Sequence, residues 1–279
     1  MKFQKIPFHK FSASANDFII LDNRKGGYSE DASHLAHIIC KRRYSVGADG
    51  LILIENSDCA SVRVRFFNPD GNEFNTCGNG GRAAARYVSL LSIAPSKMTI
   101  ETNVGVIDAE VLGETVRLKF VAPRKIELNI AVDLNGEIVR GHYVNVGEPH
   151  FIHAVQNIRQ VNFVPFARGL RYHEAFAPQG ANVHFIEQVG RQRLKIRSYE
   201  RGVEDETLAC GSGCVSSAIS TFANGDTDPP ITFEPQSGIP VAVRFDPGND
   251  FQDLYLEGDA RMVYSGELMP EGWSGFPLD

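Results

Sequence analysis

Two of the five cysteines open matching glycine-rich segments. Cys77 begins Cys77-Gly-Asn-Gly80 and Cys210 begins Cys210-Gly-Ser-Gly213, and a helix-like pattern follows each of them. A cysteine at the start of a helix faces unpaired backbone N–H groups and the positive end of the helix dipole. Both effects favour the thiolate, so we expect the pKa of each thiol to be lowered and each cysteine to be available as a base near neutral pH.

Two such thiols fit the inversion of a carbon stereocentre. One thiolate would remove a proton from one face of the carbon while the opposite thiol delivers a proton to the other face. If the carbanion forms beside a carboxylate, N–H groups at two helix starts would stabilise the developing charge. This chemistry needs neither a metal nor a pyridoxal cofactor, and we predict none.

Three other interpretations use the same residues. Zinc could be bound by Cys77, Cys210, Cys214 and a histidine, but a three-residue gap between cysteines, without a second close pair, is poor zinc spacing. A redox dithiol would favour Cys-x-x-Cys, which is absent. Residues 78–83 match a dinucleotide fingerprint, but no strand directly precedes them, so the match is interpreted as accidental.

The elements that would position these cysteines are mostly strands. Alternation of apolar and polar residues predicts strands at 61–66, 115–120, 194–197 and 241–245. Helical spacing predicts helices at Ser29–Arg43, where Asp31 or Ser33 could cap, and at 79–92 and 211–223. Because the strands do not alternate strictly with helices, the fold class is expected to be α+β.

A weak internal repeat indicates two similar halves. In both copies a glutamate, Glu73 or Glu206, stands four residues before the cysteine, and the two copies lie close to half the chain apart. Two domains that each present one cysteine at a helix start account for this pattern. The chain is expected to divide after residue 121, near Ala122-Pro-Arg124, into 1–121 and 122–262.

Composition limits the classes of function. The chain has 279 residues, of which 43% are hydrophobic and 22% charged, and its net charge is −6. This balance argues against nucleic-acid binding as the main role. No apolar run is long enough for a signal peptide or a membrane span, and an odd number of cysteines favours a reducing cytoplasm. Cys40 and Cys59 lack the glycine-rich context and are interpreted as packing residues. A homodimer is compatible with the sequence.

Further polar residues stand in short segments next to strands or glycines, where each alone is typical of a turn or cap. Arg201 is best placed for a ligand, since arginine suits bidentate carboxylate recognition. His184 and His142 are interpreted as ordinary core or surface residues. The candidates of this group are Asn16, Asn68, His150, Asn182, Glu200 and Arg201.

The sequence resembles the diaminopimelate epimerase family, whose cofactor-independent members interconvert the L,L and meso forms of 2,6-diaminopimelate. Matching segments occur in family order over nearly the whole chain. They are Asn16-Asp-Phe18, Gly47-Ala-Asp-Gly50, Phe67-Asn-Pro-Asp-Gly71, Cys77-Gly-Asn-Gly80 with Arg82, Gly147-Glu-Pro-His150, Asn182-Val-His-Phe185, Glu200-Arg-Gly-Val203 and Glu206-Thr-Leu-Ala-Cys-Gly-Ser-Gly213.

The resemblance implies a fold and a role for each matched residue. Each half would be a β-barrel-like sheet around a central helix, with 263–279 returning to the first half. Cys77 and Cys210 would be the acid/base pair. The remaining roles follow the same match: Gly78, Asn79, Gly211 and Ser212 at the reacting carboxylate, His150 and Glu200 assisting near the reacting amine, and Asn16, Asn68, Asn182 and Arg201 reading the substrate, the last three at its distal end.

Two departures concern the substrate. The family often has Asn where this chain has Glu148, and Gly-Leu-Gly where this chain has Ala13-Ser-Ala15. A carboxylate at 148 would change how the distal amine or carboxylate is held. A related racemase acting on another amino acid therefore stays open as an alternative. So do a non-catalytic small-molecule binding protein and a zinc-binding protein of the same fold.

Overall fold

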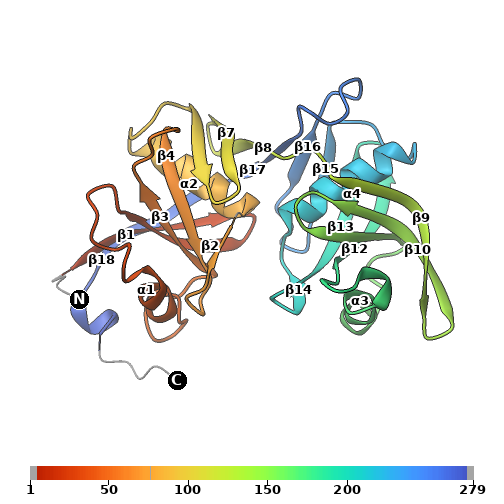
Figure 1. Cartoon of the computed structure of the whole chain (residues 1–279), viewed down its shortest axis with the longest axis horizontal. Coiled ribbons are helices and arrows are strands. Elements are labelled where there is room, and N and C mark those ends of the chain that lie inside the picture. Colours follow the sequence, from red (N-terminus) through yellow and green to blue (C-terminus); the bar gives the residue numbers. More distant parts are fainter. Residues whose placement is uncertain (1–4, 76, 275–279) are drawn as a thin grey trace. The chain divides into compact units, whose positions relative to one another are not determined.

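A computed structural model describes residues 5–75 and 77–274. The chain forms two compact units (Figure 1). The first runs to Leu118 and resumes at Asp259, and the second comprises Lys119–Gly258. These divisions lie within a few residues of the breaks that the sequence suggests after 121 and 262.

The described part of the first unit contains nine strands. Neighbouring strands pair antiparallel except for β2 with β3 and β4 with β6, which are parallel and are joined through helices α1 and α2. The returning strand β18 pairs with β1. The elements are β1 (Ile6–Ala13), β2 (Asn16–Asp22), α1 (Ala32–Ile39), β3 (Gly50–Glu55), β4 (Val62–Phe67), β5 (Glu73–Phe74), α2 (Gly78–Leu90), β6 (Lys97–Thr102), β7 (Gly105–Leu112), β8 (Thr115–Lys119), β18 (Arg261–Leu268) and the 3-10 turn η2 (Pro270–Gly272).

The second unit repeats this scheme. Here β11 with β12 and β13 with β15 are the parallel pairs, joined through α3 and α4, and the other pairings are antiparallel. The elements are β9 (Lys125–Leu134), β10 (Glu137–Asn145), β11 (Pro149–Ala154), α3 (Phe163–Arg171), η1 (Glu174–Phe176), β12 (Asn182–Gly190), β13 (Arg193–Glu200), β14 (Asp205–Thr207), α4 (Gly211–Ala223), β15 (Ile231–Glu234), β16 (Val241–Arg244) and β17 (Tyr255–Asp259).

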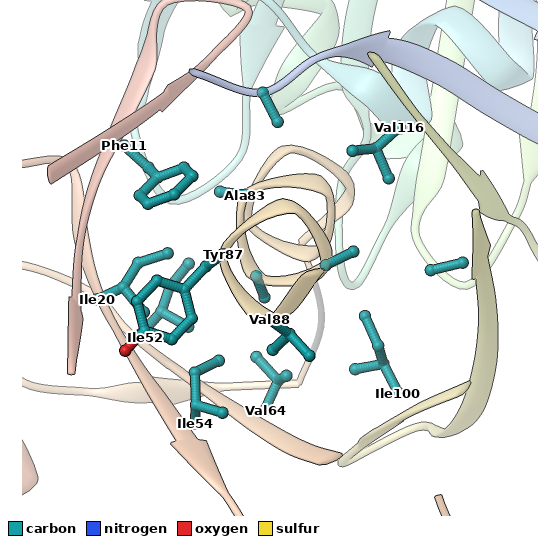
Figure 2. Packing of buried hydrophobic residues seen from close by; sticks show 14 of the residues in the cluster. Phe11, Ile20, Ile52, Ile54, Val64, Ala83, Tyr87, Val88, Ile100 and Val116 are labelled. Carbon is teal, nitrogen blue, oxygen red and sulfur yellow. The ribbon is translucent and has the colours of Figure 1, made fainter. Parts of the chain in front are cut away.

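The order of pairings is therefore the same in both halves, and β9 beside β10 corresponds to β18 beside β1. The expected α+β class, with two pseudo-symmetric halves, is confirmed. In each half the helix that follows the cysteine is the central one. Figure 2 shows Ala83 and Val88 of α2 among side chains from the surrounding strands, including Phe11, Ile52 and Val116.

The central helix α4 packs in the same manner. Its Val215 and Ala218 share one buried cluster with Ile152, Ile186 and Ile196 from β11, β12 and β13. Side chains two residues apart on a strand lie on the same face of the sheet. The three isoleucines therefore identify the face of each strand that points toward α4. Residues two positions away on each strand point toward α4 as well.

The helix predictions differ in accuracy. The helix expected at 211–223 has those bounds, and the one expected at 79–92 spans Gly78–Leu90. The prediction at Ser29–Arg43 is too long. The Asn23 side chain bonds Ser29 Oγ and the Tyr28 N–H, which holds the chain in a loop before Ala32. At the other end Arg43 has φ +73°, outside helical geometry.

The sequence patterns do not predict helix α3. It contains Pro165 and Gly169, two residues that weaken a helical pattern. Its buried face includes Phe163, Ala167 and Leu170, which share a second hydrophobic cluster of this unit with Phe185. This burial supplies the stabilisation that helix propensity does not. No helix in the described part of the chain is long and apolar enough to span a membrane.

Candidate active site

Cys77 is the N-cap residue of α2. Its backbone is extended, its Sγ accepts a hydrogen bond from the Gly80 N–H at 3.3 Å, and its carbonyl accepts from Gly81 N–H at 2.7 Å. The thiol is partly exposed. A Cβ at Gly80 would lie 2.9 Å from Cε1 of Phe66, so the glycine allows the helix start to approach β4 closely. The expected position of Cys77 at a helix start is confirmed.

A chain of amide hydrogen bonds orients the polar residues around this helix start. Asn16 Nδ2 donates to Asp49 at 2.8 Å, and Asn16 Oδ1 accepts from Asn79 Nδ2 at 3.3 Å. Asn79 Oδ1 in turn accepts from the buried Arg82 guanidinium at 3.0 Å. Arg82 can only donate and the Asp49 carboxylate can only accept, so the two ends fix which way both amides point. The structure brings Asn16 and Asn79 together.

Arg82 is itself held by the wall of the first unit. It is fully buried, and its Nη2 donates to Ser14 Oγ at 2.8 Å. Asp259 accepts from the Ser14 N–H at 2.8 Å. Ser14 and Ala15 have φ of +53° and +67°, a region that normally favours glycine. Ala15 thus has a left-handed backbone at a position where the family often has glycine, and Ser14 adds a hydroxyl that braces Arg82.

Cys210 is the N-cap residue of α4, in the position equivalent to Cys77. It is buried, and its Sγ lies 3.5 Å from Ser212 Oγ. The expectation that the helix start lowers the pKa of this thiol is wrong. Burial, followed by the charge of Glu200, raises the pKa of Cys210 well above its ordinary value, and hydrogen bonds from Ser212 and the Gly213 N–H oppose this only in part. A buried thiolate loses more hydration than these donors return.

Glu200 ends β13 beside this thiol. The Thr207 hydroxyl donates to Glu200 Oε1, and the Cys210 side chain also hydrogen-bonds the carboxylate. Burial raises the pKa of Glu200, while these two donors lower it. The second unit therefore holds a carboxyl and a thiol in contact, both shifted toward their protonated forms, and a proton can be stored on either group.

Arg201 and Asn182 lie on the same side of the second unit. Asn182 Oδ1 accepts from the Arg201 N–H at 2.8 Å, and its Nδ2 donates to the Pro149 carbonyl at 3.3 Å. Asn182 thus links the backbone of Arg201 to the segment that carries His150. The Arg201 guanidinium forms an ion pair with the carboxylate of Glu148, the residue at which this chain departs from the family pattern.

His150 is the buried end of a three-residue chain of hydrogen bonds. Its Nδ1 lies 2.8 Å from His184 Nε2, and His184 Nδ1 lies 2.9 Å from Ser198 Oγ. His184 is a fully buried core residue, which agrees with its interpretation from the sequence, and it adds a hydrogen-bonded link to His150 that the sequence does not predict. The signal for its position is the period of two on β12, which puts His184 on the same face as Asn182.

The predicted residues thus gather in two groups, one in each unit. Asn16, Cys77, Gly78 and Asn79 lie at the start of α2, and the second group surrounds the start of α4 with Gly211, Ser212 and the residues just described. Asn68 stands apart from the first network as an exposed residue of the turn after β4, where its backbone bonds Asn72. Within residues 5–75 and 77–274, no three His, Cys, Asp or Glu side chains are grouped so as to hold a metal.

Solved structures with the same fold include a PhzF-family phenazine biosynthesis protein from Bacillus anthracis. It has a TM-score of 0.72 and 18% identity, over 96% of this chain and all of that one. A probable proline racemase from Agrobacterium radiobacter gives a TM-score of 0.68 and 14% identity, over 98% of this chain and 93% of that one. The chain is thus an α+β protein with the two-unit fold of these proteins.

Sequence comparison is more specific. The diaminopimelate epimerase family model matches residues 8–122 and 142–263. The diaminopimelate epimerase of Aquifex aeolicus is 37% identical over 95% of this chain and 98% of its own length, and that of Chlorobaculum tepidum is 38% identical over 92% and 99%. This chain belongs to the diaminopimelate epimerase family and is an isomerase.

Proposed function

We propose that the protein inverts one α-carbon of L,L-2,6-diaminopimelate to give the meso form, with Cys77 and Cys210 as the two acid/base groups. The observation that carries this proposal is the repeat itself. Two units of the same topology each present a cysteine as the N-cap of their central helix, followed by Gly-x-Gly. Curated relatives named diaminopimelate epimerase support the substrate.

The reaction conserves protons. One thiolate removes the α-proton, the electron pair delocalises into the neighbouring carboxylate, and the other thiol delivers its proton to the opposite face of the carbon. The enzyme is left with the thiol and thiolate exchanged, and the reverse reaction restores them. Because burial favours the protonated form of Cys210, we assign it the role of acid in the resting enzyme and Cys77 the role of base.

The surrounding groups would act on the charged ends of the substrate. The backbone N–H groups at Gly78–Asn79 and Gly211–Ser212 suit the carboxylate at the reacting carbon, since helix starts favour anions. His150 and Glu200 suit the reacting amine. Asn16 would read the substrate from its fixed amide.

The distal amino acid end falls to a second set. Arg201 would bind its carboxylate, Asn182 would hold Arg201 in place, and Asn68 would add a contact from its exposed turn. We place the reaction in the cytoplasm, in the supply of lysine and peptidoglycan precursors. The five cysteines, none in a disulfide, are consistent with that compartment.

Proton exchange in heavy water tests the proposal. Protein incubated with L,L-diaminopimelate, without added cofactor, should incorporate deuterium at an α-carbon while meso product forms. C77A and C210A should each lower turnover by about 10²–10⁴-fold, the range for lost general acid/base catalysis. C59A is the matched control because Cys59 is exposed and outside both groups. Substantial turnover by either single variant would refute the two-thiol assignment.

A second candidate is racemisation of another amino acid. The ion pair between Glu148 and Arg201 favours it, because a carboxylate of the protein already occupies the guanidinium that a distal carboxylate would need. A panel of amino acids in the same exchange assay separates the two. Exchange with a substrate lacking the distal end, faster than with diaminopimelate, would support the second candidate.

A further inference from the structure

The face of the sheet that packs against α4 is apolar along most of the helix and polar near the start of the helix. His150, His184 and Ser198 each lie two residues from Ile152, Ile186 and Ile196, so all three face α4 on neighbouring strands. The isoleucines share a buried cluster with the helix, whereas His184 lies against Gly213 in its first turn and hydrogen-bonds His150 and Ser198 on the two flanking strands. The three polar residues are at most 2% exposed.

The first turn of α4 is fitted to this polar row. A Cβ at Gly213 would lie 2.6 Å from Nδ1 and 2.8 Å from Nε2 of His184. The imidazole therefore packs directly on the backbone of the segment that follows Cys210. Gly213 is needed there for that contact, and the position of the His184 ring is fixed by helix, strand and hydrogen bonds together.

We propose that His184, held by Ser198, is a positioning residue that sets the tautomer and orientation of His150. The inference rests on the proposed amino-acid substrate only for the donor-to-acceptor direction of these hydrogen bonds. An α-ammonium carries donors alone, so the outer nitrogen of His150 has to accept. His150 Nδ1–H then donates to His184 Nε2, and His184 Nδ1–H donates to Ser198 Oγ.

The remaining nitrogen supports this assignment. His150 Nε2 is buried and has no hydrogen-bond partner among the described residues, although buried polar atoms are nearly always paired. It is the group of the row that a bound amine would satisfy. Burial lowers the pKa of both imidazoles, that of His184 to about 3, and Arg201 lowers that of His150 further. Both rings are then neutral, so each carries one proton, and the assignment places it on Nδ1 of both His150 and His184.

The experiment uses a matched pair of serine variants. S198A removes the acceptor at the end of the row. S220A is the control, because Ser220 is equally buried in the same unit, its Oγ makes one hydrogen bond of 3.1 Å to the Ser217 carbonyl, and it is outside the row. H184F keeps an aromatic ring but removes both hydrogen bonds. Thermal unfolding by circular dichroism establishes that each variant is folded.

Nitrogen-15 NMR of histidine-labelled protein without substrate reports the tautomer. In the wild type His150 should show a protonated Nδ1 and an unprotonated Nε2, and in S198A a mixture of both forms. For S198A kcat/KM should fall about 3- to 10-fold, the effect of one hydrogen bond, while S220A stays within about twofold. H184F should fall at least as far as S198A.

Each of the following outcomes tests the inference by itself. An unchanged His150 tautomer in S198A, or an Nε2-protonated ring in the wild type, overturns the inference even if the enzyme is active. If H184F does not fold, S198A still decides. Because the NMR signal is measured without turnover, failure of the proposed epimerase activity leaves this test intact.

Discussion

Replacing Gly213 by alanine should destabilise the second unit, although alanine normally stabilises a helix. The added Cβ would lie 2.6 Å from His184 Nδ1, a separation that real Cβ atoms do not tolerate. Either the helix start is forced away from the sheet, or the imidazole moves and its hydrogen bonds of 2.8 and 2.9 Å break.

The magnitude follows from these two routes. Overpacking a core costs about 1–3 kcal/mol. Losing two buried hydrogen bonds costs a similar amount, at about 0.5–1.5 kcal/mol each. Exchanging glycine for alanine in a helix returns up to about 1 kcal/mol. The net expectation for G213A is a loss of about 1–2 kcal/mol in the free energy of unfolding, with a fall in kcat/KM as His150 loses its support.

Urea unfolding followed by circular dichroism measures this difference. The control is G81A in the first unit, where the new Cβ would meet only the flexible end of Leu118 at 2.9 Å. The double variant H184A/G213A should be less destabilised than the sum of its single variants, because removing the ring makes room for the Cβ. A G213A protein as stable and active as the wild type, or strict additivity in the double variant, would refute this packing argument.

Three further predictions concern charge and protonation. E148Q should lower KM for diaminopimelate, by up to about fivefold, because a half-exposed ion pair of about 0.2–1 kcal/mol no longer competes for Arg201; a higher KM would instead assign the Glu148 carboxylate to the distal amine. E200Q should speed alkylation of Cys210 by iodoacetamide, measured by mass spectrometry across pH, because the Glu200 charge raises the pKa of that thiol; slower alkylation would contradict it. Since burial lowers the pKa of His184 to about 3, its contribution to stability is complete above pH 6.5 and is lost by about 1.4 kcal/mol per pH unit as the pH falls toward 3; urea midpoints between pH 7 and 5 should fall less steeply in H184F, and equal slopes would count against it.

The local features of the site followed from the sequence because they depend on neighbours along the chain. The helix at 211–223 was predicted with its observed bounds, and Cys77 and Cys210 were placed at helix starts, since Cys-Gly-x-Gly before an apolar period of 3.6 is a local signal. The helix at Ser29–Arg43 was overestimated, because the side chain of Asn23, from the preceding segment, holds its expected first turn in a loop.

The features that depend on burial could not be predicted from local sequence patterns. The period of two places His184 on the same face as Asn182 but does not predict its hydrogen bonds, because its partners Ser198 and His150 come from other strands and meet it only through the registers of β11, β12 and β13. The pKa of Cys210 was expected to fall and instead rises, because the helix start contributes a few donors while the surrounding core removes water from the whole thiolate.

The sequence by itself thus determined the family, the repeated two-unit plan and the two cysteines, since each is written in short segments whose order the fold preserves. Only the tertiary structure decided the direction in which the pKa of Cys210 shifts, the pairing of Glu148 with Arg201, and the row of His150, His184 and Ser198. Solvation and cross-strand contacts depend on residues far apart in the chain. A local sequence pattern therefore does not predict how much hydration a side chain loses when the protein folds.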